Sequence, residues 1–310
     1  MKGLEIAELY FLKTGVPMIA EKFPAYRDRI AAGLVGEGSE CYGFDDELSR
    51  DHDWGPSFCL WLNSGDFEAI GRSLQREIDQ LPQEFIGFKR LESLWGSGRT
   101  GVFEISQFYQ KFIGLKHVPA GLSEWRYIPE SSLAAATNGR VFTDVSGEFT
   151  AFRNGLRAFY PEDIRLKKMA SRCMSMAQAG QYNYPRCIQR REYVAAHYAL
   201  AQFIKDAISM VFLMNREYKP FYKWMHRSLK RLPILGESMY GLLGALVTAG
   251  EEDAYQKRVE LIEKACQEII QELRRQRLSD SGSDFLLVHG PAIQSLIQDS
   301  QIRSINVWIE

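Results

Sequence analysis

The spacing of apolar residues changes near residue 155. Before this point, short apolar runs bounded by Gly and Pro are mixed with amphipathic stretches, which favours strands interspersed with helices. After Pro161, apolar residues recur at helical spacing over long segments, and the acids after this proline are typical of a first helical turn. The sequence therefore predicts an α+β fold. A mixed sheet flanked by helices is expected over residues 1–155, and an all-α helical bundle over residues 156–310.

The expected elements follow from these periods. Strands are predicted at 52–62, 100–105 and 139–147, with a short apolar step into a glycine turn at 33–39. Helices are predicted at 3–33 (one or two), 66–81, 106–114 with Ser106 as a possible N-cap, 161–179, 188–217, 220–230, 235–249, 251–278 and 284–299. Loops are predicted at 180–185 and 278–283, and His197 is expected to pack within a core helix.

Composition excludes several classes of protein. A net charge of −1 over 310 residues gives no general attraction to nucleic acid or to an anionic membrane. No apolar stretch of about 18 residues is present, so a membrane span is not expected. The five cysteines are widely spaced and include no CxxC pair, which is typical of reduced thiols in a cytoplasmic protein. The segment 1–23 is interrupted by charges and does not read as a signal peptide.

An acidic motif stands out in the first half of the chain. If Asp51-His52-Asp53 opens a strand, the two aspartates project from one face, about 6.6 Å apart at the backbone, and His52 points into the packing. Two such carboxylates repel each other unless a cation lies between them, and Mg²⁺ prefers oxygen ligands. Upstream, Gly38-Ser39 offers main-chain N–H groups and a hydroxyl to a phosphate. The alternative is an acidic surface loop whose aspartates cap turns.

These residues carry a resemblance to a known family. Gly38-Ser39, a spacer of eleven residues and Asp51-His52-Asp53 resemble the Gly-Ser…Asp-x-Asp signature of the nucleotidyltransferase superfamily related to DNA polymerase beta. The longer string GSECYGFDDELSRDHDWGP is similar to proteins in which DUF4037, a domain of unknown function, is attached to such a nucleotidyltransferase fold. The sequences of residues 160–186 and 212–229 also resemble these proteins, so the resemblance covers most of the chain.

The resemblance implies roles for individual residues. Asp51 and Asp53 would bind Mg²⁺, and Gly38 and Ser39 would hold the triphosphate. A third carboxylate on a neighbouring strand would complete the catalytic site. Glu104, in the predicted strand 100–105, is the first choice, and Asp144 is the rival, although the Ser-Gly that follows Asp144 suggests a simple turn.

A basic, aromatic segment in the helical half supplies further candidates. Arg216, Lys219 and Lys223 recur at helical spacing, with Arg227 following, and would hold nucleotide phosphates. Lys223 is the first choice for a β- or γ-phosphate. The alternative is a solvated charged face with aromatic residues packed beneath it.

The sequence therefore predicts a Mg²⁺-dependent nucleotidyltransferase. It would transfer a nucleoside monophosphate from a nucleoside triphosphate, with ATP as the expected donor, to a hydroxyl acceptor. The acceptor is expected to be a small molecule rather than a nucleic acid, and no membrane partner is expected. A protein that senses nucleotides or binds a partner on the same fold, without turnover, is the alternative. A metal-dependent phosphohydrolase would need several histidines near the motif, where only His52 lies.

Overall fold

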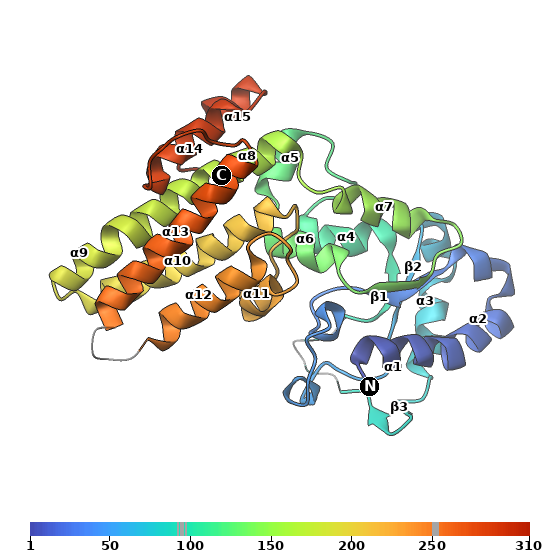
Figure 1. The fold of residues 1–310 in the computed structure, drawn as a ribbon. Helices are drawn as coiled ribbons and strands as arrows, with labels where there is room; N and C mark the ends of the chain where they lie inside the picture. The colour runs from blue at the N-terminus through green and yellow to red at the C-terminus, as the bar shows by residue number, and fades with distance from the viewer. Residues whose placement is uncertain (92, 94–95, 97, 250–253) are drawn as a thin grey trace. The chain divides into compact units, whose positions relative to one another are not determined.

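The computed structural model describes residues 1–91, 93, 96, 98–249 and 254–310. These residues form two compact units, each treated separately below. The first unit comprises Met1–Ala120 and Ile128–Ala158, and the second comprises Gly121–Tyr127 and Phe159–Glu310. The first unit combines a small mixed sheet with helices, whereas the described part of the second contains helices without strands (Figure 1). The predicted α+β class is confirmed.

A four-stranded sheet organises the first unit. Its strands are β1 (Ala31–Leu34), β2 (Cys59–Leu62), β5 (Gly101–Glu104) and β6 (Arg140–Thr143). They lie in the order β5-β2-β1-β6, with β1 antiparallel to both β2 and β6 and with β2 parallel to β5. A separate hairpin joins β3 (Glu84–Phe85) to β4 (Phe88–Lys89) through Ile86 and Gly87, both at positive φ, as a tight hairpin turn requires.

Strand directions decide which loops meet. Gly33 of β1 is opposite Cys59 of β2, which in turn is opposite Gly101 of β5. Consequently β1 ends where β2 and β5 begin, and we call this the Leu34 end of the sheet. At the other end, Leu62 is opposite Glu104, and we call this the Glu104 end.

Helices cover both faces of the sheet. They are α1 (Gly3–Tyr10), a π-helical turn (Phe11–Gly15), α2 (Val16–Lys22), α3 (Ser64–Asp79), α4 (Ile105–Ile113), α6 (Glu130–Thr137) and α7 (Glu148–Arg157), with short 3₁₀ turns at Pro24–Arg29, Glu40–Tyr42 and Leu48–Arg50. Alternation along β2 divides its residues between two cores. Leu60 and Leu62 join the cluster that contains residues of α1, α2 and α3, whereas Trp61 stacks on Phe149 of α7 at 3.8 Å between ring centroids. Burial on both faces explains why β2 is apolar throughout.

The second unit is built from helices. They are α5 (Leu122–Tyr127), α8 (Glu162–Met176), a π-helical segment (Ala177–Asn183), α9 (Tyr184–Gln189), α10 (Tyr193–Met214), α11 (Tyr222–Leu229), α12 (Gly236–Thr248), α13 (Ala254–Arg275), α14 (Leu286–Ser295) and α15 (Ser300–Ser304). Figure 1 shows α8, α10 and α13 as long neighbouring helices. None of the helices described in either unit has the length and apolar character needed to cross a membrane.

Several predicted boundaries were wrong. β2 begins at Cys59 and not at residue 52, and β1 occupies residues that were predicted to end the helix 3–33. The predicted loop 180–185 is instead part of the π-helical segment and α9, and helices α5, α6 and α7 were not predicted. The predicted helix 251–278 begins at 251–253, outside the described residues, and is observed from Ala254 to Arg275. His197 is exposed on α10 instead of packed in a core.

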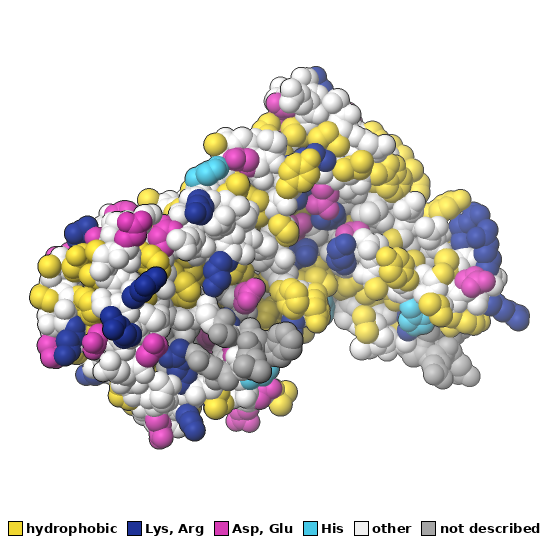
Figure 2. All heavy atoms as spheres, turned by 180° about the vertical axis from the view of Figure 1, so that it is seen from behind, with side chains coloured by type: hydrophobic (Ala, Val, Ile, Leu, Met, Phe, Trp, Pro, Cys, Tyr) yellow, Lys and Arg dark blue, Asp and Glu magenta, His cyan; other side chains and the backbone are white. Residues whose placement is uncertain are grey.

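Surface charge and thiols agree with the composition. On the face seen in Figure 2, lysine and arginine side chains are interspersed with aspartate and glutamate side chains, as expected for a chain of net charge −1. All five cysteines are free thiols, and each is buried except Cys187, which is half-buried.

Candidate functional site

The Gly38-Ser39 turn follows β1 directly at the Leu34 end of the sheet. Ser39 precedes a 3₁₀ turn, and its carbonyl oxygen accepts hydrogen bonds from the N–H groups of Tyr42 and Phe44. In the part of the chain that the structure describes, the main-chain N–H groups of Gly38 and Ser39 donate no hydrogen bond to another group of the protein. Two adjacent N–H donors and a hydroxyl are a set that suits a phosphate oxygen. The sequence placed this turn correctly, after a short apolar segment.

The Asp-His-Asp motif lies in a loop at the same end, and not on a strand. Asp53 has φ +50°, a left-handed conformation that interrupts extended backbone, and β2 begins only at Cys59. The alternation predicted for a strand therefore does not apply to Asp51 and Asp53. Nor does His52 point into the packing, because it is exposed and its Nδ1 lies 2.8 Å from the Asp51 carboxylate.

The carboxylate of Asp53 is held by Ser93. It accepts hydrogen bonds from the main-chain N–H and from the hydroxyl of Ser93, each at 2.8 Å. It also lies directly against Gly96, where a β-carbon would collide with it. Burial raises the pKa of Asp53, but the hydrogen bonds from Ser93 and the nearby Arg99 outweigh this effect, so the pKa lies below its usual value. Asp53 is therefore an ionised oxygen donor at neutral pH.

Arg99 connects the turn to the acidic loop. Its Nη2 donates to Glu40 Oε1 at 2.9 Å, and its Nη1 donates to the main-chain oxygen of Asp53 at 2.7 Å. The guanidinium and the Glu40 carboxylate both lie against the α-carbon of Gly38, so a side chain there would displace them. This close approach is the structural requirement for glycine at position 38.

Two further carboxylates are buried at the Leu34 end. Glu40 is 6% exposed, and burial raises its pKa above the usual value despite the neighbouring Arg99. Asp45 is 2% exposed, and it accepts hydrogen bonds from the N–H of Gly3 at 2.8 Å and from Trp54 Nε1 at 3.3 Å. A small cavity of about 20 Å³, roughly the size of one water molecule, lies among Glu40, Asp53 and Arg99.

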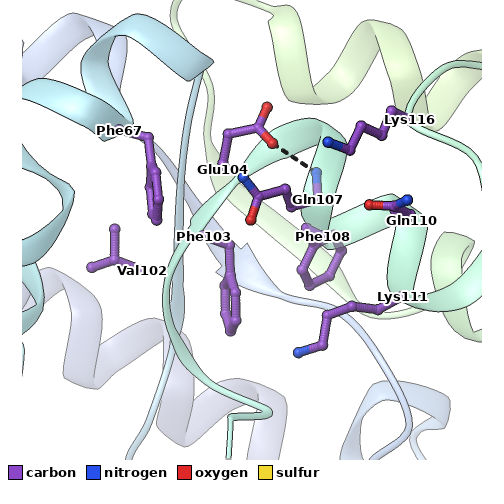
Figure 3. Close-up of a pocket in the computed structure, with 9 residues that line it drawn as sticks. All are labelled: Phe67, Val102, Phe103, Glu104, Gln107, Phe108, Gln110, Lys111 and Lys116. Carbon is purple, nitrogen blue, oxygen red and sulfur yellow. Dashed lines mark hydrogen bonds between the residues drawn. The ribbon is translucent and has the colours of Figure 1, made fainter.

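Glu104, the predicted third carboxylate, is not brought together with Asp51 and Asp53. It lies at the Glu104 end, about 10 Å along β5 from the strand's first residue. Its carboxylate caps α4 by accepting from the N–H groups of Ser106 and Gln107, and it also accepts from the hydroxyls of Ser64 and Ser106. Figure 3 shows Glu104 turned toward the first turn of α4. Glu104 is thus the N-cap, the position predicted for Ser106.

The rival, Asp144, is placed in the same way. It follows β6 at the Glu104 end, because Ala32 of β1 is opposite Thr143. Its carboxylate accepts from the N–H groups of Gly147 and Thr150 and therefore organises the start of α7. Asp144 therefore has the turn-forming role that its following Ser-Gly suggested.

A larger hollow lies beside β5 and α4. It has a volume of about 740 Å³ and is lined by Phe67, Val102, Phe103, Glu104, Gln107, Phe108, Gln110, Lys111 and Lys116 (Figure 3). Its apolar lining residues are half-buried except for the buried Phe108, and its amide and lysine residues are exposed. Lys111 is already engaged, because its Nζ donates to the carbonyl of Gly98 at 3.0 Å and lies over the ring of Phe103.

The predicted phosphate-binding cations belong to the second unit. Arg216 pairs with Glu162 at 2.7 Å, and Lys223 is exposed with its ammonium 5.1 Å from the Trp224 ring centroid. Lys219 is half-buried just before α11. Their assignment to a nucleotide stays a prediction.

At the acidic loop, the candidate metal ligands are the carboxylate oxygens of Asp51 and Asp53. Within the described ranges, no group of three His, Cys, Asp or Glu side chains is arranged to hold a metal ion. Asp51 and Asp53 nevertheless have the donor chemistry that Mg²⁺ prefers, and Ser93 leaves lone pairs on each Asp53 oxygen. Such donors fit an ion whose remaining ligands are water and substrate phosphates, not one enclosed by protein.

The residues define an α+β protein with a Gly-Ser turn and an acidic loop at one end of its sheet. Residues 125–225 match the family described as "Domain of unknown function (DUF4037)", so this domain is present. No curated protein matches the chain. Among solved structures, a nucleotidyltransferase-like protein from Exiguobacterium sibiricum 255-15 is similar at 12% identity and a TM-score of 0.35. The similarity covers 88% of this chain and 81% of that one.

Sequence reasoning missed Glu40, Asp45 and Arg99. Glu40 directly follows the Gly-Ser step, so its place in the site could have been predicted from the sequence. The place of Arg99 could also have been predicted, because a strand-helix-strand order over 59–104 predicts parallel strands. Residues that precede two parallel neighbouring strands meet at one end, which places Arg99 beside the residues that precede β2. The burial of Asp45 against Trp54 had no sequence signal.

Proposed function

We propose that the chain is a Mg²⁺-dependent nucleotidyltransferase that transfers a nucleoside monophosphate from a nucleoside triphosphate, with ATP as donor, to a hydroxyl of a small molecule. One observation carries this proposal. The Gly38-Ser39 turn and the Asp51–Asp53 loop meet at the Leu34 end of the sheet, joined by Arg99. A phosphate-accepting turn and an acidic loop are the two parts that such a reaction requires.

The turn supplies the phosphate contacts in this proposal. The N–H groups of Gly38 and Ser39 and the Ser39 hydroxyl donate to phosphate oxygens. Ser39 Oγ lies 3.5 Å from Glu40 Oε2, at the limit of a hydrogen bond, so this hydroxyl can be redirected to a ligand at little cost.

The acidic loop supplies the metal ligands. Asp51 and Asp53 hold Mg²⁺, which neutralises phosphate charge when it is bound. The depressed pKa of Asp53, caused by Ser93 and Arg99 against the opposing effect of burial, keeps it ionised for this role. Binding of a cation competes with the contact between Asp51 and His52, which is exposed and therefore weak.

The reaction is a displacement at the α-phosphorus. The acceptor oxygen forms a bond to that phosphorus, the bond to the pyrophosphate oxygen breaks, and the hydroxyl proton is released. Glu40 replaces Glu104 as the third carboxylate in this scheme, because Glu40 lies beside Ser39 whereas Glu104 lies at the opposite end. Burial raises the pKa of Glu40 above its usual value, which makes its carboxylate a stronger base.

A specific observation favours one alternative, a nucleotide-binding protein without turnover. Both predicted third acids, Glu104 and Asp144, are used as caps, and Glu40 is paired with Arg99. Such a protein would bind the triphosphate and release no pyrophosphate.

A pyrophosphate-release assay separates the two functions. The full chain is incubated with Mg²⁺, ATP and a panel of small hydroxyl compounds, with Glu40→Gln as the comparison. Acceptor-dependent release that falls at least about a hundredfold in Glu40→Gln supports transfer. Tight binding of ATP with no acceptor-dependent release supports the alternative. Release that is unchanged in Glu40→Gln removes Glu40 from the mechanism.

A further inference from the structure

Four cationic side chains on α8 are buried in the second unit, and one of them, Arg165, pairs with Glu162 of the same helix. Lys167 is 0% exposed, Lys168 is 3% exposed and Arg172 is 7% exposed. Fully buried lysine and arginine are rare unless a partner compensates their charge. A helix whose sequence carries this many buried cations therefore requires an anionic or strongly polar partner.

The partner is the segment 305–310. Lys168 Nζ donates to Glu310 Oε2 at 3.0 Å, and Arg172 Nη1 donates to Glu310 Oε1. Arg126 Nε of α5 donates to the main-chain oxygen of Glu310 at 2.6 Å. Three cations from two helices thus converge on one glutamate residue.

The same helix holds the rest of this segment through its main chain. Lys167 Nζ donates to the carbonyl oxygens of Ile305 and Asn306, at 3.2 and 2.8 Å, and the Ser171 hydroxyl donates to that of Trp308 at 3.1 Å. Of the apolar side chains in this segment, Trp308 is 42% exposed and Ile309 is 52% exposed, whereas Ile305 and Val307 are half-buried. Polar contacts therefore hold the main chain of the segment on α8.

Cationic side chains outnumber side-chain carboxylates in these contacts. In the contacts given above, Arg126, Lys167, Lys168 and Arg172 contribute four cations. The facing carboxylates are Glu310 and Asp206, which lies 3.7 Å from Arg172 Nε. Lys167 also donates to the side-chain oxygen of Gln294 at 2.8 Å, so its three acceptors are all uncharged. A phosphoryl group carries up to two negative charges and can therefore pair with several of these cations at once.

We propose that Arg126, Lys168 and Arg172 form a binding site for a phosphoryl group, here called the α8 basic site, and that Glu310 occupies it as an internal substitute. Two guanidinium groups and an ammonium offer several donors to tetrahedral oxyanions, and arginine suits phosphate geometry in particular. A phosphate-bearing ligand replaces the Glu310 carboxylate and releases the segment 305–310 from α8. This site is independent of the nucleotidyl-transfer proposal, because every residue in it belongs to the second unit.

Hydrogen exchange on the full-length chain tests the displacement without any mutation. Inorganic pyrophosphate is the probe, and sodium chloride and sodium acetate at equal ionic strength are the comparisons. We expect pyrophosphate to increase amide exchange at residues 305–310, and acetate and chloride to leave it unchanged. Equal exchange in all three salts would overturn the proposal, and an equal response to acetate would overturn the choice of a phosphoryl group.

A variant measures the competition itself. Glu310→Gln removes the internal carboxylate and leaves the three cations in place. If Glu310 fills the site more than about 90% of the time, its removal raises the apparent pyrophosphate affinity at least about tenfold. Glu237→Gln, an exposed acid on α12, is the matched control for the change in net charge. Equal affinity of Glu310→Gln and Glu237→Gln, with both variants folded by melting temperature, would contradict the proposal.

Discussion

Arg99 binds the Glu40 carboxylate with one guanidinium nitrogen and the main-chain oxygen of Asp53 with the other. Glu40 belongs to the turn that follows β1, and Asp53 belongs to the loop that precedes β2. A single side chain thus fixes the distance between the two segments on which the proposed nucleotide site depends.

Loss of Arg99 should destabilise the first unit. In Arg99→Gln, the buried Glu40 loses its counter-charge, so the free energy of unfolding should fall by about 3 kcal/mol. The double variant Arg99→Gln/Glu40→Gln should regain part of this loss, because it leaves no uncompensated charge. Urea denaturation of both variants measures the difference. A double variant no more stable than Arg99→Gln would show that Arg99 does not act through Glu40.

Gly38→Ala should weaken nucleotide binding. The new methyl group displaces the Arg99 guanidinium and the Glu40 carboxylate, which are the movable ends of side chains. We expect at least a tenfold loss of ATP affinity, about 1.4 kcal/mol, by isothermal titration calorimetry. Gly65→Ala is the control, because an added β-carbon there has ordinary contacts. If both alanine variants bind ATP as the wild type does, the turn is not the phosphate site.

Glu104→Gln should affect stability and leave nucleotide binding intact. Glu104 caps α4 and lies at the other end of the sheet, so the cost should be about 1 kcal/mol of unfolding free energy. Burial raises the pKa of Glu104, but hydrogen bonds from Ser106, Gln107 and Ser64 outweigh it and lower the pKa below 4.5. The stability difference from wild type should therefore be complete above pH 4.5 and shrink as the pH falls below it. A loss of ATP affinity instead would restore Glu104 to the site.

Glu310 should stabilise the second unit in a defined pH range. Burial raises its pKa, but Arg172 and Lys168 outweigh this and lower it to about 2, from 4.5. A carboxylate with a depressed pKa stabilises the fold above its unfolded pKa and loses this effect as the pH falls toward the folded value. The difference in melting temperature between wild type and Glu310→Gln should be constant above pH 5 and decrease between about pH 4.5 and 2. A difference that does not change with pH would place the contribution of Glu310 elsewhere.

Hydrophobic period predicted the long helices of the second half and the strands near 101–104 and 140–143. It failed for β1, because Ala31-Ala32-Gly33 has little intrinsic preference for a strand and owes its extended form to pairing with β2 and β6. It also failed at 52–58, where a strand was predicted although Gly55-Pro56 indicates a break in extended structure. Pro56 lacks an N–H, and Gly55 has φ +121°, so the extended strand begins only after them.

The candidate site was predicted in part. Sequence placed the Gly38-Ser39 turn after an apolar segment, but it treated Glu104 as a neighbour of Asp51 and Asp53. The direction of β5 decides this question, because a strand parallel to β2 carries its last residue away from the residues that precede β2. The roles of Ser93 and Arg99 depend on tertiary contacts across about 40 residues of chain, which local patterns do not encode.

Calorimetric titration of a non-hydrolysable ATP analogue with Mg²⁺ tests the central claim most directly. Wild type is compared with Asp51→Asn/Asp53→Asn and with Glu104→Gln, an acid at the other end of the sheet. We predict Mg²⁺-dependent binding to wild type and to Glu104→Gln, and a loss of at least about tenfold in the double variant. Equal affinities in wild type and the double variant, or no binding by any folded form, would contradict the account.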